Sequence, residues 1–153
     1  MTVSFVPVAR VRNGRTDTRD AGWGGLESTL EFAPEFAGGL DGLEHWSHAL
    51  VVFHLHVEPA DARPAPGWRR RPRDRADLPL LGVFAQRGRL RPNPIGVTAV
   101  RIVRVEPPRL VVRDLDAIDG TPVLDVKPWT AAFDAVEGAR APAWFEALMR
   151  DYF

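Results

Sequence analysis

The stretch that decides the fold reads VTAVRIVRV over residues 97–105. β-branched residues dominate it, and apolar side chains recur at every second position, which is typical of a β-strand. Val97, Ala99, Val103 and Val105 lie on one side, with Arg101 as the exception. The pattern predicts a strand whose odd-numbered side chains form an apolar face.

Six further stretches have strand character, and clusters of proline, glycine and aspartate separate them. They cover residues 5–11, 27–32, 49–57, 80–86, 110–112 and 122–126. Short strands spaced in this way predict a mainly β protein, a small sheet or barrel-like sheet. We find no alternation of strands and helices, and no glycine-rich nucleotide fingerprint follows a strand.

Two short helices complete the expected fold, over residues 40–47 and 142–152. Pro142 suits the first position of the second helix. Phe145, Leu148, Met149 and Tyr152 follow the i, i+3, i+4, i+7 spacing of one helical face. This apolar stripe predicts a core contact or a dimer contact for the C-terminal helix.

Composition fits a soluble, single-domain protein over residues 1–153, with 45% apolar and 26% charged residues. No apolar run approaches the length of a membrane span, and the N-terminus lacks the pattern of a secretory signal. The absence of cysteine excludes disulfides and cysteine-ligated metals. We expect a cytoplasmic protein that does not enter a membrane.

Arginine is concentrated in one part of a chain whose net charge is zero. Only Asp74 and Asp77 oppose the arginines at positions 63, 69, 70, 71, 73, 75, 87, 89 and 91. Part of this cluster lies in residues 59–79, which carry five prolines and predict a long loop. The arginines either keep the surface soluble or, as Arg70 and Arg71 would, bind nucleic-acid phosphates.

Three phrases carry the functional signal: GVFAQR at 82–87, RPNPIG at 91–96 and DGTPVLDVKPW at 119–129. The prolines give the second phrase one shape at low entropic cost, and ordered loops of this kind often carry binding residues. The phrases resemble the TsaA-like family of S-adenosylmethionine-dependent methyltransferases. Its best-known members, the TrmO enzymes, methylate N6 of threonylcarbamoyl-adenosine at position 37 of tRNA. The resemblance extends from about residue 8 to residue 129.

The resemblance implies S-adenosylmethionine as cofactor, tRNA as substrate and a homodimer. It places the cofactor against Arg19, Asp20, Leu55, His56, Arg87, Val97, Asp114, Leu115 and Asp116. Arg87 would grip the carboxylate of the cofactor through a bidentate pair, although an arginine at a strand end also simply solvates a sheet edge. Asp116 would accept hydrogen bonds from ribose hydroxyls. His56 is the only nearby residue whose type suits it to accept a proton.

Other residues keep two interpretations. Arg91 either anchors a phosphate or holds the Pro-Asn-Pro loop, and Asn93 either forms a turn or reads an adenine edge. Trp23 either stacks on a base or packs within its loop. Asp119-Gly120 indicates a turn, while Asp125 and Lys127 share a strand face and would pair.

Four histidines, His45, His48, His54 and His56, lie close together in the sequence, yet no nearby acidic residue completes a metal site. We therefore expect no metal, and structural or surface roles for His45 and His54. His48 matches a family histidine that supports the fold.

The chain departs from the TrmO pattern in several places. Gln86, Val126 and Trp129 stand where the family phrases have threonine, isoleucine and tyrosine. In the loop where TrmO enzymes usually have Pro-Arg-Gln-Pro-Gly, only Arg19 is retained. TrmO enzymes also commonly carry a C-terminal extension that engages tRNA, so either the arginine-rich loop takes that role here or the substrate differs. The alternatives are a methyltransferase for a small molecule and a non-enzymatic module that binds the cofactor.

Overall fold

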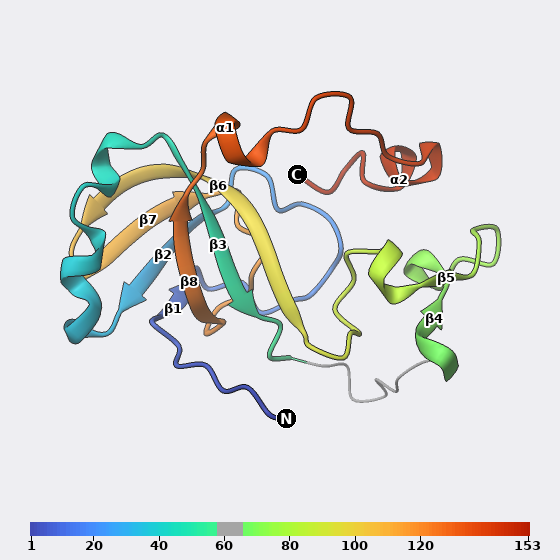
Figure 1. Cartoon of the computed structure of the whole chain (residues 1–153), viewed down its shortest axis with the longest axis horizontal. Coiled ribbons are helices and arrows are strands. Elements are labelled where there is room, and N and C mark those ends of the chain that lie inside the picture. The colour runs from blue at the N-terminus through green and yellow to red at the C-terminus, as the bar shows by residue number, and fades with distance from the viewer. Residues whose placement is uncertain (58–65) are drawn as a thin grey trace.

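The computed structural model describes residues 1–57 and 66–153, and within them six antiparallel strands close into a barrel (Figure 1). Neighbouring strands follow the order β1-β2-β7-β6-β3-β8, and β8 pairs with β1 to close the barrel. The strands are β1 (Ala9–Arg12), β2 (Glu27–Phe32), β3 (His48–His54), β6 (Ile95–Glu106), β7 (Arg109–Arg113) and β8 (Pro122–Pro128). The mainly β, barrel-like fold that the sequence predicts is therefore confirmed.

The core fills the inside of this barrel. Every strand contributes side chains that are almost entirely removed from water, and β-branched and leucine residues dominate. They include Val11, Leu30, Val51, Phe53, Val100, Leu110, Val112 and Val123. Period-two alternation along each strand sends these residues inward, so hydrophobic burial determines the register.

Strand β6 corrects the prediction of one apolar face over residues 97–105. Thr98 and Val100 point inward, whereas Val97 is 43% exposed. A β-bulge lies between Ile102 and Arg104, where the pairing with β7 gains one residue. Because an extra residue reverses the alternation, Val105 packs against the core although Val97 does not.

The short helical elements differ from the two predicted helices. Residues 34–45 form two 3-10 turns, η1 (Pro34–Leu40) and η2 (Leu43–His45), in place of a helix over 40–47. Gly42 separates the turns with a φ of 88°, which interrupts helical geometry. The C-terminal helix exists but is shorter than 142–152: α2 covers Ala143–Leu148, and a single-turn helix, α1 (Ala131–Asp134), precedes it.

Residues 66–91, which we call the arginine arm, stand to one side of the barrel (Figure 1). A two-stranded sheet of β4 (Arg69–Arg70) and β5 (Leu81–Gly82) lies among the 3-10 turns η3 (Pro66–Trp68), η4 (Pro72–Asp74) and η5 (Val83–Ala85). The predicted strand over 80–86 is thus mostly a turn. The part of the predicted loop that the structure describes, 66–79, is ordered by turns and β4, and the rest of that loop lies outside the described residues.

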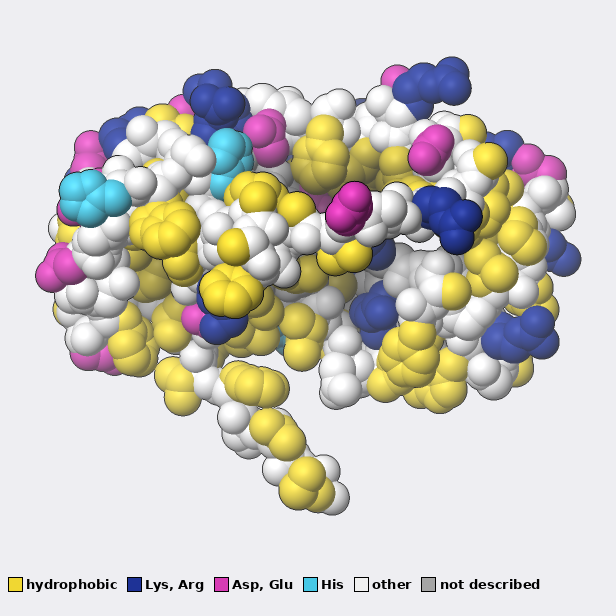
Figure 2. Space-filling view, turned by 45° about the horizontal axis from the view of Figure 1, so that its top comes forward, with side chains coloured by type: hydrophobic (Ala, Val, Ile, Leu, Met, Phe, Trp, Pro, Cys, Tyr) yellow, Lys and Arg dark blue, Asp and Glu magenta, His cyan; other side chains and the backbone are white. Residues whose placement is uncertain are grey.

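The predicted strand over residues 5–11 begins only at Ala9. The preceding segment extends away from the barrel, and its apolar side chains, Val3, Phe5 and Val6 among them, are exposed (Figure 2). Within the described part of the chain, no helix has the length and apolarity needed to cross a membrane.

Candidate functional site

Asp116, in the segment that follows β7, is held from two sides. Thr98 of β6 donates a hydrogen bond from Oγ1 to Oδ1 of Asp116. Tyr152, close to the C-terminus, donates from Oη to Oδ2 over 2.5 Å. Thr98 is itself buried on the inner side of β6. The carboxylate is therefore fixed where the barrel meets the C-terminal segment.

Tyr152 is half-buried and contacts one residue of the predicted cofactor set, Asp116. Burial raises the pKa of its phenol most strongly, and the charge and hydrogen bond of Asp116 raise it further. Asp20 adds to the increase in pKa, whereas Arg87 opposes it. Arg87 and Asp116 are also held by neighbouring residues of β6, because Arg87 donates to the carbonyl oxygen of Val97 and Asp116 accepts from Thr98. The structure thus brings together residues that are far apart in sequence.

Residues 13–25 form the loop on one side of this cluster. The backbone N–H of Gly25 donates to Oδ1 of Asp114 over 2.6 Å. Asp114 has a φ of 70°, a left-handed conformation that aspartate tolerates better than most residues. Leu115 is completely buried in the barrel core, so its side chain is enclosed by protein.

Trp23 packs within its loop, which is one of the two roles that the sequence left open. It is 4% exposed, and the guanidinium of Arg15 lies 3.4 Å from the centre of its ring. Arg15 also donates to the carbonyl oxygens of Gly22, Ala21 and Arg19 at 2.8, 2.9 and 3.1 Å. The indole is therefore sandwiched inside its loop, and no face is left open for a base.

Arg19 extends from the same loop into solvent. Its side chain is 82% exposed and its Nε donates to Oδ1 of Asp17 over 3.0 Å. That hydrogen bond raises the pKa of Arg19 and lowers the pKa of Asp17. Arg19 thus stands at the rim, beside the cluster around Tyr152 and outside it.

Arg87 connects the arginine arm to β6. Its Nη2 donates to the carbonyl oxygen of Val97 over 2.6 Å. The residue is exposed, and Val97 presents its side chain to solvent next to it. A guanidinium has five N–H donors in a planar fork, so this single contact leaves donors for an anionic ligand.

Two arginines fold the arm back onto itself and onto the barrel. Arg91 Nη1 donates to the carbonyl oxygens of Gln86 and Gly88 at 2.8 and 3.2 Å. This supports the interpretation in which Arg91 holds the loop. Arg89 donates to the carbonyl oxygens of Val57 and Thr18, both at 3.3 Å. Arg89 therefore joins the arm to the end of β3 and to the loop of Arg19.

Backbone hydrogen bonds hold the Pro-Asn-Pro loop and attach it to Leu55. Asn93 is exposed, and its carbonyl oxygen accepts from the N–H of Ile95 over 2.8 Å, as its turn interpretation requires. The N–H of Leu55 donates to Pro94 over 2.8 Å, while the Leu55 side chain packs against the core.

The arm arginines expected to bind phosphates already have partners within the protein. Arg70 forms a two-point pair with Asp74 at 2.7 and 2.5 Å, and Arg71 donates to the carbonyl oxygen of Leu78. Arg75 pairs with Asp77 at 2.5 Å. Arg73 reaches the loop of residues 13–25, where its Nε and Nη2 donate to Oδ2 and O of Asp20 at 2.5 and 2.6 Å. The arm is thus stabilised by its own guanidinium groups.

The histidines do not gather at the cluster around Tyr152. His56 is half-buried, and burial, then the neighbouring His54, then Arg10, lower its pKa. His48 Nδ1 lies 2.8 Å from Ser47 Oγ, and its ring packs edge-on against Trp129. Among the residues that the structure describes, no three His, Asp or Glu side chains are placed to hold a metal ion.

Two sequence interpretations outside the cluster are confirmed. Asp119 accepts hydrogen bonds from the N–H groups of Asn13 and Gly14 in a turn where Gly120 has a φ of 79°, and these bonds lower the pKa of Asp119. Lys127 Nζ pairs with Asp125 Oδ2 over 2.6 Å. Neither aspartate faces the candidate site.

Sequence reasoning missed Thr98, Tyr152, Arg15 and Arg89. Tyr152 was part of a predicted helical stripe, but α2 ends at Leu148 and the tail beyond it turns toward Asp116. The two arginines give no signal in the sequence pattern, because their partners are backbone carbonyls, which every residue has. A buried threonine on the inner face of β6 was the one visible sign that a polar group lies opposite it.

The donor set of the cluster fits S-adenosylmethionine. Asp116 and Asp114 are carboxylates suited to ribose hydroxyls, Arg87 suits a carboxylate, and the glycines of 22–25 allow close backbone approach. Gly24 already touches the tail so closely that an added Cβ would lie 2.3 Å from the carbonyl carbon of Phe153.

The comparisons with known proteins agree with this chemistry. Residues 18–135 match the family described as the tRNA-methyltransferase O N-terminal domain. A protein of Methanothermobacter thermautotrophicus, named a probable S-adenosyl-L-methionine-binding protein, is 35% identical over 141 residues, which cover 89% of this chain and 96% of that protein. A similarly named protein of Pyrococcus abyssi is 37% identical over 121 residues, 79% of this chain.

Solved structures show the same fold. The crystal structure of TrmO from Pseudomonas aeruginosa superimposes with a TM-score of 0.75 at 33% sequence identity, over 94% of this chain. The chain spans less than two thirds of several relatives, 62% of that TrmO and 61% of the Pyrococcus protein. Family match, sequence identity and fold agree, and the chain belongs to the tRNA-methyltransferase O (TsaA-like) family.

Proposed function

We propose that residues 1–153 act as a single-domain, S-adenosylmethionine-dependent methyltransferase for N6 of a modified adenosine at position 37 of tRNA. The observation that carries the proposal is that adjacent residues of β6 hold both groups: Val97 accepts from Arg87, and Thr98 donates to Asp116, which also accepts from the half-buried phenol of Tyr152. Oxygen acceptors and a guanidinium at one place match the two polar ends of the cofactor.

In this proposal each residue holds a defined part of the cofactor. Arg87 binds the carboxylate of the methionine portion, and Asp116 accepts from the ribose hydroxyls. Asp20 and the exposed side chain of Val97 complete the walls, with Asp114 holding the loop through Gly25. When bound, S-adenosylmethionine supplies an activated methyl group on a sulfonium.

The residues of the chain then act mainly by placement. A methyl transfer of this type depends on proximity and in-line alignment, which rigid contacts such as Thr98 to Asp116 provide. The carboxylates also favour a nearby positive charge. His56 is the proposed proton acceptor by type, and its lowered pKa keeps the ring neutral, the form that accepts a proton.

The arginine arm supports an RNA substrate. It carries eight arginines against two aspartates, and Phe84 is 79% exposed within it. Basic and aromatic side chains together suit single-stranded RNA, whose bases stack on aromatic rings. In Figure 2, dark blue lysine and arginine side chains are visible on the right, the side on which the arginine arm lies in Figure 1.

We also propose a cytoplasmic homodimer. The outer face of β6 exposes Ile95 and Val97, and Phe133 of α1 is 88% exposed. Apolar surface of this kind is commonly covered by a partner. Light scattering at micromolar concentration tests the dimer, and a monomer mass alone would contradict it.

The decisive experiment is a methylation assay with radiolabelled S-adenosylmethionine on bulk tRNA. The wild-type chain is expected to label tRNA and Arg87→Ala is expected not to, while Arg109→Ala on the far wall of the barrel serves as a control. Cofactor binding without labelling of tRNA would indicate a binding module, and transfer to a small molecule would indicate the other enzyme class.

A further inference from the structure

The segment after α2 enters the candidate site through backbone hydrogen bonds. The N–H of Gly22 donates to the backbone carbonyl of Asp151 over 3.2 Å, and the N–H of Trp23 donates to the backbone carbonyl of Tyr152 over 2.9 Å. The tail therefore runs along the loop of residues 13–25, and its position fixes where the phenol of Tyr152 lies.

The phenol reaches Asp116 from the side opposite Thr98. Thr98 donates to Oδ1 and Tyr152 donates to Oδ2, so each carboxylate oxygen already has one donor. An ionised carboxylate offers about four lone-pair sites, which leaves further sites for ligand hydroxyls. Two donors held by β6 and by the tail prevent the carboxylate from rotating.

We propose that Tyr152 is a positioning residue of the cofactor site, which orients the carboxylate of Asp116 so that its free lone pairs meet the ribose hydroxyls of S-adenosylmethionine. This inference rests on the proposed function. It assigns to the C-terminal tail a part of the cofactor site that none of the family motifs in this sequence contains.

The surroundings of Tyr152 argue for this role over simple packing. A residue that served only to fill space would not need its hydroxyl to donate to Asp116, the carboxylate that Thr98 holds by its other oxygen. The ring of Phe153 packs edge-on against that of Tyr152, with centroids 4.9 Å apart, and supplies apolar contact without a polar group. Phe153 is therefore the natural control position.

The first test needs no cofactor, because Tyr152 is the only tyrosine of the chain. Its ionisation can be followed by ultraviolet absorbance in the full-length protein. We expect the phenol to ionise well above the usual pH of about 10. Asp116→Asn should bring the ionisation down toward that value. A wild-type phenol that ionises near pH 10, or an Asp116→Asn variant with no change, would overturn the contact.

The second test measures cofactor affinity by calorimetry. Tyr152→Phe should weaken S-adenosylmethionine binding about ten-fold, as expected for losing a hydrogen bond to a charged group. In the Asp116→Asn background the same change should have little further effect, because the phenol acts through that carboxylate. Thr98→Val, which removes the other donor, should resemble Tyr152→Phe, and Phe153→Leu should leave affinity unchanged.

Each other result contradicts the inference. Tighter binding by Tyr152→Phe would mean that the tail competes with the cofactor, and unchanged binding would mean that the hydroxyl is a bystander. An equal loss in both backgrounds would indicate a purely structural role. A wild-type chain that shows the raised phenol ionisation but binds no cofactor would overturn the proposed function, and with it this role, while the contact itself would stand.

Discussion

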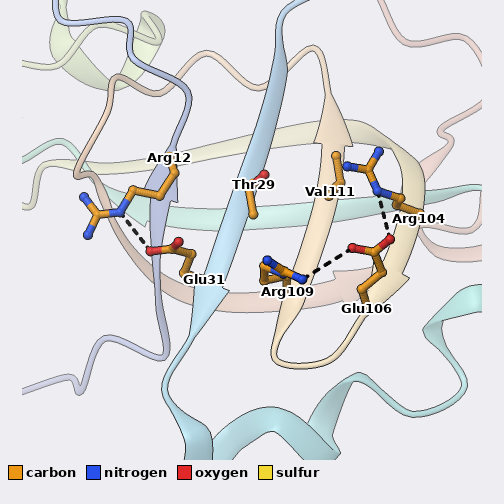
Figure 3. Close-up of a pocket in the computed structure, with 7 residues that line it drawn as sticks. All are labelled: Arg12, Thr29, Glu31, Arg104, Glu106, Arg109 and Val111. Atoms are coloured by element: carbon orange, nitrogen blue, oxygen red, sulfur yellow. Dashed lines mark hydrogen bonds and ion pairs between the residues drawn. The ribbon is translucent and has the colours of Figure 1, made fainter.

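Two regions of the molecule are rich in arginine and use it differently. One is the barrel wall formed by β1, β2, β7 and β6, and the other is the arginine arm. On this barrel wall, arginines pair with glutamates: Arg12 of β1 with Glu31 of β2 at 2.9 Å, and Arg104 with Glu106 within β6 at 3.1 Å (Figure 3). These residues line a shallow groove of about 230 Å³ that contains none of the predicted cofactor residues. In the arm, Arg71, Arg89 and Arg91 donate to backbone carbonyls.

The difference follows from what the backbone lacks in each region. Strands of a closed barrel satisfy one another's N–H and C=O groups, so the guanidinium groups above them mostly meet side chains. Arg10 of β1 reaches a backbone carbonyl only in a turn, that of Gly120 at 3.4 Å. The arm has two strands of two residues each, and many of its carbonyls have no ladder partner. Arginine supplies those partners. Substitutions in the arm should therefore cost structure or binding, and substitutions on the wall should cost little.

The largest effect is expected for Arg87→Ala, at the junction between the arm and β6. Loss of a two-point contact to the cofactor carboxylate should weaken binding by about 2–4 kcal/mol. Calorimetry with S-adenosylmethionine measures it, and Arg109→Ala is the matched control on the wall. Unchanged affinity in Arg87→Ala would show that this guanidinium does not hold the carboxylate.

Arg91→Ala should destabilise the arm itself. Two carbonyls, those of Gln86 and Gly88, lose their donor, which should lower the free energy of unfolding by about 1–3 kcal/mol. Urea denaturation measures the loss, and proteolysis should cut first within 83–90. Arg91→Lys keeps the charge but not the fork, so it separates hydrogen bonding from electrostatics. Wild-type stability in both variants would refute the role of Arg91 as a clamp.

The double change Arg70→Ala and Arg71→Ala tests whether arm arginines that already have protein partners also bind RNA. If they contact phosphates, the log–log dependence of RNA affinity on salt should flatten by roughly one unit or somewhat more. Cofactor affinity should stay nearly constant. An unaltered salt slope would assign these two arginines to folding the arm alone, and would weaken tRNA as the substrate.

The smallest effect is expected on the wall. The hydrogen bond to Glu31 raises the pKa of Arg12, but both side chains of the pair are about half exposed, at 48% and 49%. Exposed pairs of this kind contribute little to stability because water and salt screen them. Arg12→Ala should therefore leave the thermal midpoint within error of the wild type. A clear drop would mean that the wall behaves like the arm.

Period-two alternation was sufficient to predict the barrel, because burial of one strand face is a local property of the sequence. It failed in detail at β6, where the bulge at Val103 reverses the buried side. The order of the arm was not predictable from hydropathy, since guanidinium–carbonyl bonds leave no periodic pattern.

The candidate site was predictable only in part. The motif residues Arg87 and Asp116 bind to adjacent residues of β6, Val97 and Thr98. Tyr152 reaches Asp116 through a tail whose path depends on backbone contacts to Gly22 and Trp23. Nothing in the local pattern around Tyr152 distinguishes such a tail from the end of a helix. Trp23, in turn, had two equal interpretations until the position of Arg15 over its ring was known.

Closure of the barrel by β1 and β8 limits how copies of this protein can associate. Each of the six barrel strands has a neighbour on both sides, so the barrel offers no open row of N–H and C=O groups to a strand from another molecule. Within the described residues, the remaining strand edges belong to β4 and β5, which are too short to template a sheet. Assembly through the barrel must therefore rest on side-chain surfaces, and runaway edge-to-edge polymerisation is blocked by topology.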